Sequence, residues 1–202
     1  ADAKRVAVQL GIDFKVFDFE TQYRQKVVDY MLDEYRAGRT PNPDIMCNQE
    51  VKFKLFLETS LAAGADYIAT GHYARVERLA DTARLLRARD DNKDQTYFLY
   101  RVTSEALAKT VFPLGNLTKP EVRQIAKDRG LWTARKKESM GVCFVGNVGM
   151  REFLSQYITT RPGDIIDKES GRVLGRHDGA IFYTLGQRHG LDVGGGLPYY
   201  VV

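Results

Sequence analysis

Apolar residues in the first hundred positions recur at two spacings, which predict helices that alternate with strands. Helical spacing at 28–35 and over about 48–63 places the apolar residues of each stretch on one face. Short apolar runs at 14–19 and 67–70 predict buried strands. Strands and helices that alternate at these lengths favour the α/β class, with a parallel sheet covered by helices.

The second hundred residues predict a helical segment followed by a β-rich tail. The pattern is helical from about 103 to 131, and Thr118 and Glu121 have the spacing of a capping box. A further helix is expected around 150–157. Short strands separated by glycine-bearing turns then follow at 164–167, 172–174 and 180–184.

These patterns divide the chain into three parts. Residues 1–102 are expected to form part of a nucleotide-binding domain, and 103–160 a helical extension that carries Cys143. Residues 161–202 are expected to form a small, truncated β-rich domain. The chain starts at Ala1, inside a predicted helix, and this start suggests a fragment of a longer protein.

Composition is that of a chain able to pack a core, with 44% apolar and 28% charged residues. No apolar stretch approaches the roughly 18 residues that a membrane helix needs, and no charged and then apolar leader opens the chain, so neither a membrane helix nor secretion is signalled. The formal net charge is +4, and a net +5 lies within 119–137 alone. This basic stretch favours an anionic partner such as a nucleic acid, although such stretches are usually only solvated faces.

The chain has two cysteines, Cys47 and Cys143, and three scattered histidines. Two cysteines are too few for a disulfide-built secreted domain, and no ligand spacing of a zinc site is present. Composition alone therefore favours two reduced cytosolic thiols, and no metal site is expected.

The most unusual segment is 40–49, in which two prolines flank Asn42 and Cys47 comes directly before a predicted helix. A thiol at a helix N-terminus has a lowered pKa, as a nucleophile needs, and Asp44 can relay a proton. The alternative is a rigid surface turn with a buried, inert cysteine.

Cys143 stands between glycines, downstream of three basic residues at 135–137 that would stabilise a thiolate or a persulfide. Its alternative is a small apolar residue in a short strand.

Two further segments have the residue types of a nucleotide or RNA site. Gly71 and His72 end the strand at 67–70, where ligands bind in open α/β sheets. Lys93 and Gln95 precede the aromatic stretch 96–100, and they can hold RNA phosphates and base edges. The alternatives are ordinary loops, with Tyr97 and Tyr100 in the core of a buried strand.

Five segments in this order resemble the tRNA-specific 2-thiouridylases, which belong to the PP-loop ATP pyrophosphatases. The segments are 38–48 (GRTPNPDIMCN), 69–75 (ATGHYAR), 92–99 (NKDQTYFL), 141–146 (GVCFVG) and 184–191 (TLGQRHGL). The resemblance covers essentially the whole chain. It implies a partial parallel-sheet PP-loop ATPase domain of the adenine nucleotide α hydrolase type, with a helical segment and a small β-rich module.

The resemblance also implies an activity and roles for residues. ATP, with Mg²⁺, would adenylate the C2 oxygen of the wobble uridine of a tRNA, and sulfur from a persulfide would replace it. Cys143 would carry the persulfide received from a sulfur-relay protein, and Cys47 would be the partner thiol that can pair with Cys143 as a disulfide. The remaining roles are contacts with the target base (Asn42, Pro43, Asp44), with ATP (Gly71) and with tRNA (His72, Lys93, Asp94, Gln95), with Asp44 also the candidate acid or base.

The chain departs from the family's pattern at both ends. The Ser-Gly-Gly-x-Asp-Ser-Ser loop that cradles ATP phosphates would lie upstream of Ala1, and a terminal β-barrel would follow Val202. These 202 residues alone are therefore not expected to adenylate tRNA. Two other hypotheses stay open: a noncatalytic RNA-binding module, and another PP-loop enzyme such as an amide-forming ligase.

Overall fold

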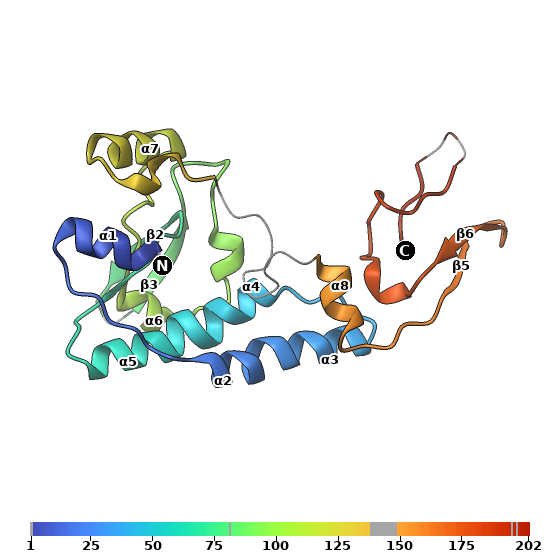
Figure 1. Cartoon of the computed structure of the whole chain (residues 1–202), viewed down its shortest axis with the longest axis horizontal. Coiled ribbons are helices and arrows are strands. Elements are labelled where there is room, and N and C mark those ends of the chain that lie inside the picture. The colour runs from blue at the N-terminus through green and yellow to red at the C-terminus, as the bar shows by residue number, and fades with distance from the viewer. Residues whose placement is uncertain (1, 81, 138–148, 195, 197) are drawn as a thin grey trace. The chain divides into compact units, whose positions relative to one another are not determined.

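The computed structural model describes residues 2–80, 82–137, 149–194, 196 and 198–202 (Figure 1). These fall into two compact units, one made of 1–27 with 44–140 and the other of 28–43 with 141–202. No helix in the described part of the chain has the length and apolar character needed to cross a membrane.

Helices make up most of the first unit. Its α-helices are α1 (Asp2–Leu10), α2 (Glu20–Tyr23), α4 (Pro43–Met46), α5 (Leu57–Ala62), α6 (Ser104–Ala108) and α7 (Lys119–Asp128). Wider π-helical turns form η2 (Cys47–Phe56) and η1 (Arg24–Asp29), whose last two residues belong to the second unit. The 3-10 turns are η3 (Thr96–Leu99) and η4 (Trp132–Arg135). The expected helix over 48–63 is confirmed as η2 and α5.

Two small sheets lie in this unit. Strand β1 (Ile68–Ala69) pairs in parallel with β4 (Thr110–Val111), and β2 (Ala74–Leu79) pairs antiparallel with β3 (Thr82–Arg87). Ten buried residues form the core: Phe53, Leu57, Ile68, Ala74, Ala83, Leu99, Val102, Ala106, Leu107 and Phe112. The core joins η2 and α5 to both sheets and to α6. It thereby packs the parallel strands β1 and β4 against helices, as expected for an α/β fold.

The helical stretch predicted over 103–131 is broken into α6, β4 and α7. Pro113 lies in the interruption, and proline cannot continue a helix interior. Thr118 and Glu121 form the predicted capping box at the start of α7, where the Glu121 carboxylate accepts from the Thr118 amide at 2.7 Å. No residue of α7 is fully buried.

Three predicted strands are wrong. Residues 14–19 form no strand and expose Val16 by 78%, since no strand of the described chain pairs with this run. Residues 96–99 form η3, and residues 180–182 form the 3-10 turn η5 (Ala180–Phe182). Apolar runs this short do not distinguish a strand from a helical turn.

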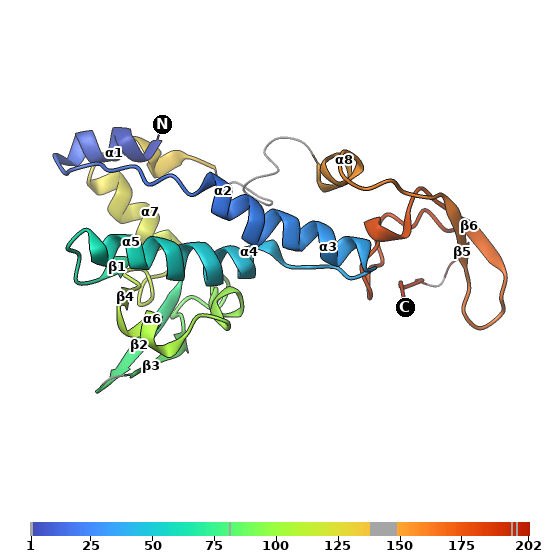
Figure 2. The ribbon, with the colours of Figure 1, turned by 90° about the horizontal axis from the view of Figure 1, so that it is seen from below.

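Contacts along α1 place it beside α7 and η4 in this unit (Figure 2). The Gln9 amide donates to the Gly130 carbonyl at 2.8 Å, and the Arg5 guanidinium lies 5.4 Å from the centroid of the Trp132 ring. The start of the chain therefore contacts the segment that follows α7.

The second unit contains α3 (Tyr30–Arg36), α8 (Met150–Ser155) and η5. Its strands β5 (Gly163–Ile166) and β6 (Val173–His177) form an antiparallel hairpin with a register shift between Ile165 and Ile166. The helix expected around 150–157 is confirmed as α8, which buries Leu154. The Arg151 guanidinium ties α8 to η5, since it lies 4.5 Å from the Phe182 ring centroid and pairs with Asp178 at 2.8 Å.

Candidate functional site

Cys47 lies in the second turn of a helical run and not at its N-terminus, so that expectation is wrong. The run starts at Pro43, whose fixed φ suits the first helical position, and Cys47 begins the π-helical η2. Cys47 is buried, with 5% of the residue exposed. π-Helical turns are uncommon and often occur at functional sites.

The neighbours of Cys47 on either side contact η3 and the residues directly after it. The Asn48 amide donates to the Phe98 carbonyl at 2.9 Å, and the Arg101 guanidinium lies 3.4 Å from the Met46 sulfur. Asn48 is only 2% exposed. The turn that carries Cys47 is therefore fixed to 98–101 on both sides of the thiol.

The residues expected to meet the target base come directly before this turn. Asn42 is partly exposed and Pro43 is buried at the helix start, while Asp44 is partly exposed in the first turn of α4. Cys143, the expected persulfide carrier, lies outside the described residues, and so does the expected pairing with Cys47.

Gly71 and His72 follow β1, as the sequence predicts. The His72 ring is packed between aromatic rings, with centroids 5.6 Å from Phe53 and 6.2 Å from Phe112. Its Nδ1 shares a hydrogen bond of 2.9 Å with the Thr70 hydroxyl. Burial, together with the positive charge of Lys52, lowers the pKa of His72 to about 4. The imidazole is therefore neutral at pH 7 and can offer hydrogen bonds but no positive charge to a ligand.

This neutral histidine predicts a pH dependence of stability. An unfolded histidine takes up a proton near pH 6.5, whereas folded His72 does so only near pH 4. As the pH falls through this window, protonation of the histidine therefore stabilises the unfolded state relative to the folded state. The free energy of unfolding should drop by about 1–3 kcal/mol, allowing for the partial exposure of His72. Urea unfolding at pH 7 and pH 4.5 measures this drop, which His72→Gln should reduce by that amount.

His189→Gln is the matched control, because His189 is exposed in the second unit. Its pH dependence should equal that of the unmodified protein. An unchanged pH dependence in His72→Gln would contradict the assignment.

The loop 91–95 places its three expected tRNA contacts in different surroundings. Lys93 and Gln95 line a pocket, and the Gln95 side-chain oxygen also accepts from the Tyr73 amide at 2.9 Å. The Asp94 carboxylate accepts from the Ala88 amide at 2.8 Å and from the Thr96 hydroxyl at 2.6 Å. Burial opposes its ionisation, but these hydrogen bonds and the charge of Arg87 outweigh it and hold the pKa of Asp94 below its usual value. Asp94 therefore shapes the loop.

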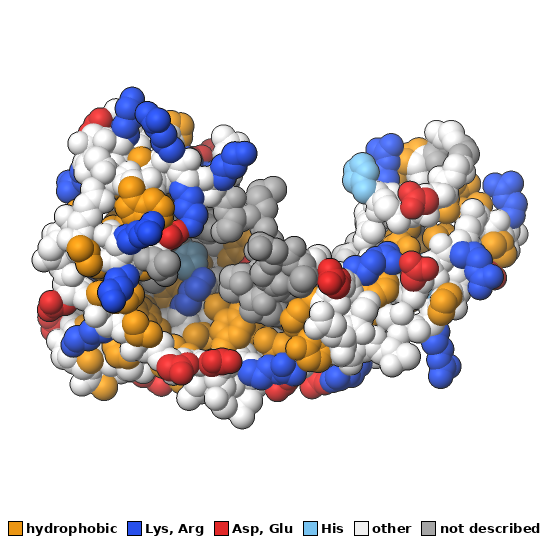
Figure 3. Space-filling model, in the orientation of Figure 1, with side chains coloured by type: hydrophobic (Ala, Val, Ile, Leu, Met, Phe, Trp, Pro, Cys, Tyr) orange, Lys and Arg blue, Asp and Glu red, His pale blue; other side chains and the backbone are white. Residues whose placement is uncertain are grey.

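The pocket has a volume of about 600 Å³ and begins beside Gly71. One wall is a face of α7 at helical spacing, from Lys119 through Arg123 to Ala126. Its cationic lining residues are Lys93, Lys119, Arg123, Lys136 and Lys137, and no acidic residue of the described chain lines it. Figure 3 shows basic side chains gathered around α7 on this face of the unit. A pocket with this lining suits phosphate groups.

A buried carboxylate connects two walls of this pocket. Asp90 is 8% exposed, and its carboxylate accepts from the backbone amides of Lys119 at 2.8 Å and Asn92 at 3.1 Å. Its carbonyl accepts from the Lys93 amide. Asp90 thus fixes the start of α7 to the loop 91–95.

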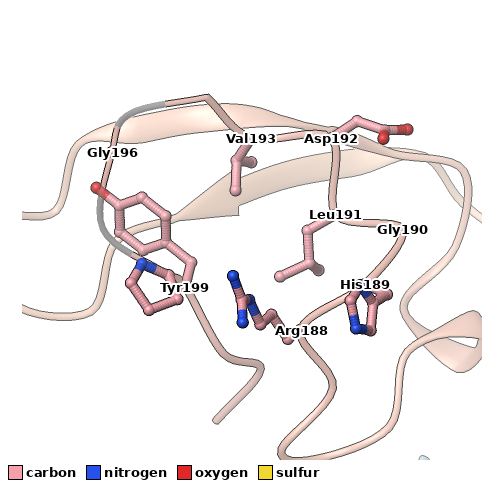
Figure 4. Close-up of a pocket in the computed structure, with 9 residues that line it drawn as sticks. Arg188, His189, Gly190, Leu191, Asp192, Val193, Gly196 and Tyr199 are labelled. Atoms are coloured by element: carbon pink, nitrogen blue, oxygen red, sulfur yellow. The ribbon is translucent and has the colours of Figure 1, made fainter.

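The second unit has a pocket of about 290 Å³ around Arg188 (Figure 4). The Arg188 side chain lies between Leu191 and Tyr199 in this view. Gln187 shapes the segment, because its side chain accepts from the Thr184 amide and donates to the His189 carbonyl. Among the described residues, no three His, Cys, Asp or Glu side chains cluster as metal ligands would.

Comparison with known proteins places these features in a family. Residues 1–147 match the family described as the tRNA methyl transferase HUP domain, and 151–202 match the tRNA methyl transferase PRC-barrel domain. The chain belongs to this family. The HUP match agrees with the predicted nucleotide-binding α/β fold, and the PRC-barrel match with the β-rich tail.

Relatives of the chain in this family are named tRNA-specific 2-thiouridylase MnmA. The chain is 56% identical to those of Bacillus velezensis and Bacillus licheniformis and 55% identical to that of Bacillus subtilis. Each similarity covers all 202 residues of the chain and 54% of the relative. The chain therefore spans about half the length of these relatives.

Of the cations that line the pocket, the sequence analysis singles out only Lys93 as a site residue. The sequence indicates the basic stretch 119–137 and gives residues 135–137 a role beside Cys143, but it does not indicate that Lys119, Lys136 and Lys137 line one pocket with Lys93. The signal was present in α7, where Lys119, Val122, Arg123 and Ala126 share one face.

Proposed function

We propose that this chain is part of a tRNA 2-thiouridylase that uses ATP to replace the C2 oxygen of a wobble uridine with sulfur. The observation that carries the proposal is the identity of 55–56% over all 202 residues to relatives of that name. The basic pocket supports it, since Gly71 and Lys93 come from two different motifs and line one pocket without acidic residues in the described chain.

In this proposal ATP adenylates the C2 oxygen, releasing pyrophosphate and making AMP a leaving group. The terminal sulfur of a Cys143 persulfide attacks C2, and AMP departs with the oxygen. The Cys47 thiolate then attacks the Cys143 sulfur, which breaks the persulfide bond and leaves the sulfur on uridine. The resulting Cys47–Cys143 disulfide is reset by a dithiol that supplies two electrons.

The other residues have supporting roles in this proposal. Asn42, Pro43 and Asp44 meet the target base, and Asp44 relays a proton. Gly71 contacts ATP, which carries Mg²⁺, while His72, Lys93 and Gln95 contact the tRNA and Asp94 holds their loop in shape. A sulfur-relay protein delivers the persulfide sulfur to Cys143. The protein acts in the cytoplasm, where its tRNA substrate is found.

The test is to incubate the full-length protein with a tRNA transcript, ATP and a persulfide donor, and to analyse the digested nucleosides by mass spectrometry. A gain of sulfur for oxygen, dependent on ATP, is the expected result. A gain of a methyl group would contradict the proposal in favour of the chemistry in the family's description.

The same assay separates the two other hypotheses. ATP consumption stimulated by a small carboxylic acid and not by tRNA would indicate another PP-loop ligase. RNA binding without modification or ATP consumption would indicate a noncatalytic module.

A further inference from the structure

Tyr97 in η3 and Tyr100, the residue directly after η3, face solvent, against the expectation that they belong to the core. Tyr97 is 65% exposed and Tyr100 is 64% exposed, with ring centroids 6.3 Å apart and planes inclined by 43°. In a 3-10 turn, positions i and i+3 lie on one side, and this puts both rings on the same face. Neither hydroxyl has a hydrogen bond among the described residues.

The backbone beneath these rings is held firmly. Leu99, between them in sequence, is fully buried in the core, and the Phe98 carbonyl accepts from the buried Asn48 amide. Asn48 follows Cys47 directly, so the aromatic face is anchored beside the turn that carries the proposed nucleophile. A fixed aromatic face loses little conformational entropy on binding a flat partner.

The pocket lined by the residues just upstream of this face is cationic. Lys93 and Gln95, directly upstream of η3, line the basic pocket, whose described lining contains five cations and no acidic residue. Aromatic faces next to a cationic pocket are typical of surfaces that bind single-stranded nucleic acid, because bases stack while phosphates are neutralised. A protein partner is less well matched to this surface, because no carboxylate of the described pocket lining could pair with basic residues of that partner.

We propose that Tyr97 and Tyr100 stack on unpaired bases that flank the target uridine, while phosphates of the same RNA strand occupy the basic pocket. This inference rests on the proposed function, since it assigns the occupant of the surface beside Cys47. Stacking tolerates different bases, so the contact positions the loop of a tRNA without reading its sequence.

The test uses the full-length protein and an anticodon stem-loop RNA with 2-aminopurine next to the target uridine. Tyr97→Leu and Tyr100→Leu should each weaken RNA binding by about 5- to 20-fold and abolish the fluorescence change caused by stacking. Tyr97→Phe and Tyr100→Phe keep the aromatic face and should behave as the unmodified protein. Tyr67→Leu is the matched control, since Tyr67 is 50% exposed elsewhere in the same unit.

Salt dependence separates the two parts of the surface. The leucine variants should keep the slope of log K against log salt, because they remove no charge. Lys119→Gln should reduce this slope by about 0.7 and retain the fluorescence change.

The outcomes distinguish this inference from the proposed function. Unchanged binding and fluorescence in the leucine variants, in a protein that thiolates tRNA, would overturn the inference and leave the function standing. Tyrosine-dependent stacking in a protein that modifies no tRNA would support the inference and overturn the function. A large loss of thermal stability in the leucine variants, with RNA affinity retained in those still folded, would show that another part of the protein covers the rings, which also overturns the inference.

Discussion

Full-length protein carrying Cys47→Ser is expected to lose tRNA thiolation by about 10³-fold or more, because a serine hydroxyl cannot attack the persulfide sulfur as a thiolate does. Serine is close to cysteine in size, and both neighbours of Cys47 are held by other segments, so the turn should keep its shape. The measurement is the 2-thiouridine content of a tRNA transcript after digestion, under single-turnover conditions with a persulfide-loaded enzyme.

Cys143→Ser should cause a loss of the same size, since it removes the proposed carrier of sulfur. Ser60→Ala is the control for a small change at a buried helix position, and it should leave the rate unchanged. Pyrophosphate release with tRNA and ATP should persist in both cysteine variants. Thiolation at the unmodified rate in either cysteine variant is incompatible with the two-thiol mechanism.

Gly115→Ala should destabilise the protein by about 3 kcal/mol or more. A Cβ atom at this position would lie 2.0 Å from the Ala74 carbonyl oxygen and 2.7 Å from Cγ of Arg75. The first of these is backbone and cannot rotate away. The turn around Gly115 would have to separate from β2, whose start follows Tyr73 of the basic pocket. Urea unfolding of the full-length protein at pH 7 measures the loss.

Gly149→Ala is the matched substitution, since its φ of −73° suits alanine and a Cβ there would meet nothing within 4 Å. We expect it to change the free energy of unfolding by less than about 1 kcal/mol. If Gly115→Ala unfolds at the same urea concentration as Gly149→Ala, the close approach of Gly115 to β2 is wrong.

The helices could be predicted from sequence because their signals are local. Thr118 and Glu121 mark the start of α7 through side-chain chemistry that depends on three residues of spacing. The apolar face of η2 and α5 likewise repeats over several turns. Such signals do not depend on the rest of the fold.

The prediction failed where the outcome depends on distant partners. The run 14–19 has the composition of a strand, but a strand needs a partner strand. Among the strands of the described chain, none pairs with this run. Residues 96–100 were expected to form a buried strand, with Tyr97 and Tyr100 in the core, but both side chains are exposed. Positions three apart lie on the same side of a 3-10 turn, whereas they lie on opposite faces of a strand.

The candidate site was predictable only in part for the same reason. The thiols and the motif residues follow from resemblance to a family, position by position. The basic pocket requires Lys93 to meet Lys119 and Lys136, which come from three separate segments. No spacing within one segment encodes that meeting.

The shared carboxylate of Asp90 has a consequence for how the basic pocket would accept a ligand. It holds the start of α7 and the loop 91–95 together, because both donate hydrogen bonds to one buried side chain. Widening the pocket on one side would break a bond to a buried carboxylate. For the RNA ligand proposed above, such a pocket would favour backbone conformations whose phosphate spacing already matches it, so that the conformational adjustment on binding would fall to the RNA.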